Sequence, residues 1–124
     1  MNRHLILTVA AALLLASGAA PAESLPLQSV NKANTVIVLP AGAIEQHGAH
    51  LPCAVDSIIS QGVIGHALAL LPEEVPAFAL SPITYGKSDE HLHFPGTMTL
   101  EGATLLNMVT EIGESVYRAG FRKL

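Results

Sequence analysis

A run of five apolar or β-branched residues at positions 35–39 restricts the fold of this 124-residue chain more than any other feature. The run reads Thr-Val-Ile-Val-Leu and is closed by Pro-Ala-Gly. A strand with one solvent-facing side alternates apolar and polar residues, whereas a strand covered on both faces is apolar throughout. The run therefore predicts a strand covered on both faces, as in a parallel sheet, with its end at the Pro-Ala-Gly turn.

The residues that follow predict an α/β alternation. A helix is expected to begin at Asp56, a good N-cap residue, and to end before Pro72. Its apolar residues recur at a spacing of four, at Ile59, Val63, Ala67 and Leu71. Residues 77–83 are apolar and bounded by prolines, which predicts a short second strand, and the polar residues 85–96 predict a loop.

A second helix is expected after Thr99, which we interpret as its N-cap residue. One apolar face runs along it, formed by Leu105, Val109, Ile112 and Val116. Gly120 followed by apolar Phe121 is a typical helix stop, so the chain from Phe121 onward should enter another strand. Together these elements predict the α/β fold class.

The first 22 residues have the organisation of a secretory signal peptide. A short positive start precedes an apolar run at positions 5–16, and the segment ends in Ala-Pro-Ala. The run is shorter than the roughly 20 residues that a membrane span needs, so no stable membrane anchor is expected. We predict cleavage after Ala22, a periplasmic or secreted location, and a mature domain over residues 23–124.

Charge excludes one class of function. The chain has six basic against ten acidic residues and a formal net charge of −4. Such a balance gives no general electrostatic attraction to the phosphate backbone, so we expect no nucleic-acid partner.

The densest polar cluster follows the first predicted strand, where open α/β sheets place their ligand sites. It contains Glu45, His47 and, at the predicted helix start, Asp56. Imidazole and carboxylate ligands suit zinc, manganese or iron, and one carboxylate can bridge two ions. The alternative is that Asp56 only caps the helix and that Glu45 and His47 are solvated loop residues.

A second polar cluster lies within residues 86–97. Its His91 and His93 could ligate a metal, hydrogen-bond a substrate or be simply exposed. Ser88 lies in the same stretch but outside any Gly-x-Ser-x-Gly nucleophile motif, so serine hydrolase chemistry is disfavoured.

Taken together, these motifs resemble the creatininase family, the creatinine amidohydrolases and their relatives. The resemblance rests on Leu-Pro-Ala-Gly-Ala-Ile-Glu-Gln-His-Gly at positions 39–48, then Asp56, then Tyr-Gly-x-Ser-x-Glu-His at 85–91 and Phe-Pro-Gly-Thr at 94–97. It implies a three-layer α/β/α sandwich around a parallel sheet, assembled into homo-oligomers. It also implies hydrolysis of the C–N bond of a small cyclic or linear amide at a centre of two divalent metal ions.

The resemblance further implies a role for each site residue. Glu45 would bind one ion, His47 the other, and Asp56 would bridge them. Ser88 and His91 would border the substrate. After Gly-Phe-Arg-Lys the family continues into a further strand and an Asn-Gly-His motif that carries another ligand, so we expect the domain to be incomplete at its C-terminus.

Two main hypotheses of function result. The chain is the amino-terminal part of an exported metal-dependent amidohydrolase, or it is a truncated, non-catalytic remnant that binds a metal ion or a partner subunit. A third hypothesis is a small periplasmic module that captures metal with its His-rich loop. No residue is assigned as a catalytic acid, base or nucleophile.

Overall fold

The computed structural model of the protein describes residues 30–124, so the predicted signal peptide at 1–22 lies outside the described residues. Strands β1 (Val36–Val38) and β2 (Ala77–Ala79) pair in parallel, with Ile37 opposite Phe78. On its other side β1 lies against the end of the chain, because the Ile37 amide donates a hydrogen bond of 2.9 Å to the Lys123 carbonyl. β1 is therefore flanked on both edges.

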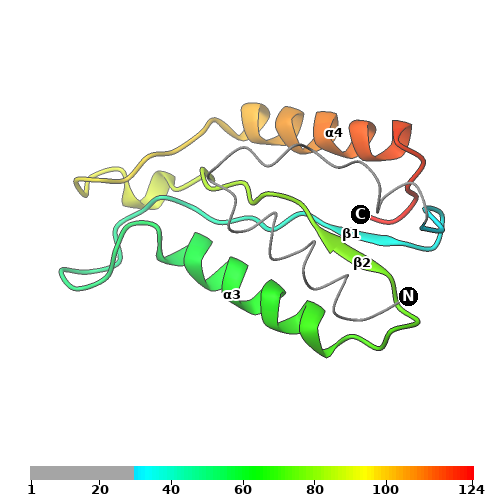
Figure 1. The fold of residues 1–124 in the computed structure, drawn as a ribbon. Coiled ribbons are helices and arrows are strands. Elements are labelled where there is room, and N and C mark those ends of the chain that lie inside the picture. The colour runs from blue at the N-terminus through cyan, green and yellow to red at the C-terminus, as the bar shows by residue number, and fades with distance from the viewer. Residues whose placement is uncertain (1–29) are drawn as a thin grey trace, which may run out of the picture.

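Two long helices cover this strand layer. Helices α3 (Val55–Leu70) and α4 (Gly102–Arg118) lie on opposite faces of it, as Figure 1 shows. The described residues thus form the α, β and α layers of a three-layer sandwich. Among them, Ile37, Ile83 and Phe121 are the buried apolar side chains. The core accordingly lies between β1 and the helices.

Both predicted strands are present but shorter than expected. Regular pairing in the first covers three of the five predicted residues, and regular pairing in the second ends at Ala79. Beyond Pro82 the second segment rejoins the first through a parallel bridge between Ala41 and Ile83. Proline lacks an amide hydrogen, which is why the ladder is interrupted there.

Helix α3 is present where it was predicted, but the predicted N-cap residue was wrong, and the apolar residues at a spacing of four do not form a buried face. Its N-cap residue is Ala54, without a side-chain cap, and Asp56 lies within the first turn. Ile59 and Val63 are exposed, by 57% and 63%, while Ser57 is buried. Residues four apart do not stay on one side of a helix with 3.6 residues per turn. Apolar residues also lie on most sides of α3, so the sequence does not indicate which side is buried.

Helix α4 agrees more closely with its prediction. Of the predicted apolar face, Leu105, Ile112 and Val116 are partly buried and Val109 is exposed. The N-cap residue is Glu101 rather than Thr99, whose hydroxyl is used elsewhere. Gly120 has a φ of +101°, the left-handed conformation expected after a helix. The chain then turns back beside β1 through an isolated parallel bridge between Val36 and Lys123, at the place where another strand was predicted to begin.

The predicted loop at 85–96 contains one short helical turn, η1 (Asp89–His91). Within residues 30–124, no helix is long and apolar enough to cross a membrane.

Candidate metal centre

Two glycines let the segments that follow β1 and β2 come together at one end of the molecule. A Cβ atom on Gly42 would lie 2.5 Å from Ser57 Oγ and 2.8 Å from the Ser57 backbone nitrogen. A Cβ atom on Gly86 would lie 2.8 Å from the Gly42 carbonyl oxygen. Only residues without a Cβ atom permit such approaches. The loop after β1 therefore passes directly over the first turn of α3.

This approach brings the three predicted metal ligands together. One ligand atom from each of Glu45, His47 and Asp56 lies within 4.8 Å of the others. His47 Nε2 is 3.2 Å from Asp56 Oδ1 and 3.8 Å from Glu45 Oε1. All three side chains are partly buried, with exposed fractions of 15% for Glu45, 26% for His47 and 33% for Asp56.

The hydrogen bonding of His47 fits a cation at this position. Its Nδ1 lies 3.1 Å from the Glu45 carbonyl oxygen, an acceptor, so we assign the Nδ1 proton to that contact. In the neutral ring, Nε2 is then an acceptor that faces the carboxylates of Glu45 and Asp56. Three acceptors facing one another repel unless a proton or a metal ion lies between them. A backbone carbonyl that fixes the second nitrogen is a common partner of metal-binding histidines.

A second group of potential ligands shares Glu45. Ligand atoms of Glu45, Glu90 and His91 also lie within 4.8 Å of one another. His91 Nε2 is 3.8 Å from Glu45 Oε1, and the His91 ring stacks on the His47 ring with a centroid separation of 6.4 Å. Glu90 was missed in the sequence as a candidate ligand, although its position beside His91 in a short polar turn was visible.

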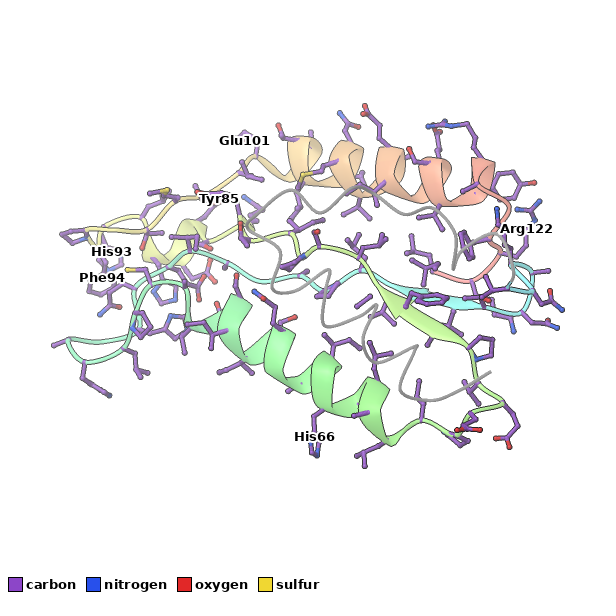
Figure 2. All side chains as sticks on the ribbon, viewed as in Figure 1. His66, Tyr85, His93, Phe94, Glu101 and Arg122 are labelled. Atoms are coloured by element: carbon purple, nitrogen blue, oxygen red, sulfur yellow. The ribbon has the colours of Figure 1, made fainter. Side chains whose placement is uncertain are left out.

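The structure brings His91 to the candidate centre but places Ser88 differently. Ser88 is fully buried, and its Oγ has no hydrogen-bond partner among the described residues. Its backbone amide donates to Thr99 Oγ1 at 2.8 Å. The Ser88 side chain thus lies beneath the loop surface, whereas the His91 side chain is 30% exposed. His93 packs on Phe94 with a centroid separation of 4.1 Å, and both lie at the tip of the loops (Figure 2).

Two sets of contacts hold the η1 loop beside Glu45. The first is a loop latch formed by Lys87, Asp89 and Thr99: the Lys87 ammonium pairs with the Asp89 carboxylate, and Thr99 Oγ1 donates to Asp89 Oδ1 at 3.0 Å. Those hydrogen bonds lower the pKa of Asp89, and the hydrogen bond with Asp89 raises the pKa of Lys87.

The second set joins the loop after β1 to the segment after η1. The Met98 amide donates to the Ile44 carbonyl at 2.8 Å, and the Gln46 amide donates to Thr97 Oγ1 at 3.2 Å. The supporting roles of Thr97 and Thr99 were missed in the sequence. The Phe-Pro-Gly-Thr motif could have pointed to Thr97 as a residue of the site. The position of Thr99 before a predicted helix indicated only an N-cap role.

Comparisons with known proteins agree with this geometry. Residues 23–124 match the family described as "Creatininase: Creatinine amidohydrolase". The chain is 37% identical over 94 residues to a creatinine amidohydrolase of Pseudomonas putida, covering 72% of this chain and 35% of the relative. It is also 37% identical over 82 residues to a mycofactocin precursor peptide peptidase of Mycolicibacterium smegmatis, covering 64% and 33%.

Solved structures give the same result. A structure described as "Creatininase Mn" superimposes with a TM-score of 0.65 at 36% identity, covering 73% of this chain and 36% of that one. A creatininase variant complexed with creatine superimposes with a TM-score of 0.66 at 36% identity, covering 74% and 36%. The chain spans about a third of the length of the curated relatives it matches. By sequence and by its α/β fold, the chain belongs to the creatininase family.

Proposed function

We propose that this chain carries part of the active site of an exported, metal-dependent amidohydrolase, which hydrolyses the C–N bond of a small cyclic or linear amide. The observation that supports this most directly is the set of three facing acceptors, His47 Nε2 and the carboxylates of Glu45 and Asp56. Two carboxylates and one imidazole suit a divalent ion such as zinc, manganese or iron.

In this proposal each ligand has a distinct part. Glu45 would hold one ion, His47 would hold a second, and the Asp56 carboxylate would be shared between them. The carbonyl contact at Nδ1 keeps the His47 ring oriented with its Nε2 lone pair toward the centre. Divalent ions bound here would polarise the amide carbonyl and lower the pKa of water at the site.

The proposed substrate lies against the η1 loop. His91 is a partly exposed side chain of that loop and lies close to Glu45, so it is placed to contact an amide bound at the centre. Ser88, fully buried, would border the substrate from beneath the loop and act through the loop's shape. The relatives named above are a creatinine amidohydrolase and a peptide peptidase, which supports a substrate with an amide bond.

The test combines metal analysis with hydrolysis. The chain is loaded with Mn²⁺ or Zn²⁺ and assayed on a panel of small cyclic and linear amides. His47→Ala and Asp56→Asn should each lower metal-dependent hydrolysis by more than about 100-fold, because loss of a ligand exceeds the 10–100-fold effect typical of its outer-shell partners. His66→Ala is the matched control, since it removes an exposed imidazole from the outer side of α3 (Figure 2).

Two outcomes would redirect the proposal. Equal hydrolysis by the wild type and both ligand variants would disprove the assignment of the centre. Metal binding without hydrolysis of any amide would instead favour the alternative function, a non-catalytic metal-binding protein. Sedimentation of the metal-loaded chain would test the homo-oligomer that family membership suggests.

Export is proposed separately. The positive start, the apolar run and the Ala-Pro-Ala end of residues 1–22 support a cleaved signal peptide. After expression with the natural start, the mature protein should begin at Glu23 and be found in the periplasm or medium. An intact Met1 on protein retained inside the cell would contradict this.

A further inference from the structure

Glu45 lies between two imidazole rings that differ in their hydrogen bonding. Its Oε1 atom is 3.8 Å from His47 Nε2 on one side and 3.8 Å from His91 Nε2 on the other. The two rings are nearly parallel, with an interplanar angle of 10°. Because both rings face the same carboxylate, the tautomer of each neutral ring decides which one offers a lone pair to a metal ion and which one donates a hydrogen bond to the carboxylate.

The two rings favour opposite tautomers. In His47 the Nδ1 proton is directed at the Glu45 carbonyl, which leaves Nε2 as an acceptor and a possible ligand. In His91 the Nδ1 atom is buried and has no hydrogen-bond partner among the described residues. Buried N–H groups without an acceptor are rarer than unsatisfied acceptors, so the single proton of neutral His91 belongs on Nε2, facing the Glu45 carboxylate.

Two backbone hydrogen bonds hold the His91 main chain in place, and one aromatic ring lies beside its side chain. Its amide donates to the Ser88 carbonyl at 3.1 Å, and its own carbonyl accepts from the Phe94 amide at 2.9 Å. The Phe94 ring lies beside the His91 ring, with a centroid separation of 6.1 Å and an interplanar angle of 41°. The 3.8 Å separation from Glu45 exceeds a hydrogen bond, and a small rotation of the carboxylate or one water would close it.

We propose that His91 is a positioning residue for Glu45: its Nε2–H orients the carboxylate toward His47 and Asp56, and His91 is not itself a metal ligand. This inference rests on the proposed metal centre. It goes further, because it gives His91 a role in orienting the metal ligand Glu45 in addition to contact with substrate. Outer-shell partners of this kind change metal affinity by 10–100-fold.

The test measures Mn²⁺ affinity by calorimetry and the Mn²⁺ paramagnetic resonance spectrum, both without substrate. His91→Phe keeps an aromatic ring at this position but removes the donor, so binding should weaken by about 10–100-fold. His91→Gln keeps an N–H donor of similar reach and should restore most of the affinity. His93→Phe is the matched control, because its ring packs on Phe94 and it belongs to neither potential ligand group.

Each result has a definite meaning. Wild-type affinity in His91→Phe would overturn the inference, and equal weakening in His91→Gln and His91→Phe would also overturn it, since the N–H donor would then not account for the loss. A wild-type chain that binds no Mn²⁺ would overturn the metal centre together with this inference. Circular dichroism of each variant separates loss of affinity from loss of folding.

Discussion

At the scale of single residues, Gly42 determines how closely the loop after β1 approaches helix α3. A Cβ atom added there would lie 2.5–2.8 Å from three atoms of Ser57. Two of these are backbone atoms, which cannot move away by a side-chain rotation. Gly42→Ala should therefore destabilise the fold by about 1–3 kcal/mol, as overpacking does. It should also weaken Mn²⁺ binding, because Glu45 and His47 would move away from Asp56. Urea unfolding and calorimetry measure the two effects.

Gly62→Ala is the control for this substitution. Gly62 lies in α3, the helix that contains Ser57, and nothing lies within 4 Å of a Cβ atom placed on it. Alanine should raise helix stability there by about 0.5–1 kcal/mol. If Gly42→Ala and Gly62→Ala change the free energy of unfolding alike, the close approach at Gly42 does not explain the effect of Gly42→Ala.

The same residues show how far the sequence could predict the candidate site. Glu45 and His47 were placed at the end of a buried strand by pattern alone, and Asp56 at the start of a helix. The structure brings the three together. The sequence could not show that Asp56 lies inside the first turn with its carboxylate toward His47, because a capping residue and a first-turn residue have the same composition signal.

At the scale of elements, the loop latch should make the η1 loop sensitive to pH. The hydrogen bonds from Lys87 and Thr99 lower the pKa of Asp89 below its ordinary 3.8, so the latch contributes stability above pH 3.8 that is lost as the pH falls through the lowered value. The pKa of Lys87 is raised above 10.5, so its contribution is present below pH 10.5 and is lost at higher pH.

The Ser88 amide reports on the latch, because it donates to the Thr99 hydroxyl. Its NMR chemical shift should stay constant near neutral pH and move in acid below about pH 4. Asp89→Asn should abolish the acid transition. Glu114→Gln, which removes an exposed carboxylate of α4, should leave it unchanged. An acid transition that persists in Asp89→Asn would show that another group is responsible.

Elements were predictable where sequence pattern and packing agree. The amphipathic face of α4 and the stop at Gly120 are confirmed, because one face of that helix is apolar and a glycine supplies the left-handed turn. The apolar residues that recur at a spacing of four in α3 do not form its buried face, since Ile59 and Val63 are exposed. The packing of α3 depends on the small Ser57 side chain fitting against Gly42, a contact between segments that periodicity within one helix does not contain.

At the scale of the whole molecule, the described residues bury few apolar side chains, with Ile37, Ile83 and Phe121 between β1 and the helices. The candidate centre joins two separate segments, the loop after β1 and the first turn of α3. A metal ion that binds the folded state alone therefore adds a cross-link between segments that a small core holds weakly.

Metal binding should accordingly raise the free energy of unfolding. At a free Mn²⁺ concentration of about 100 times Kd the increase is expected to be about 2.7 kcal/mol, provided that the unfolded chain does not bind the ion. Urea unfolding with Mn²⁺ and with chelator, at matched ionic strength, measures it. Asp56→Asn should lose most of this increase, whereas Glu114→Gln should keep it, since Glu114 lies on α4 and pairs with Arg118. An equal increase in both variants would place the stabilising ion elsewhere, and no increase despite direct binding would mean that the ion does not distinguish the folded from the unfolded chain.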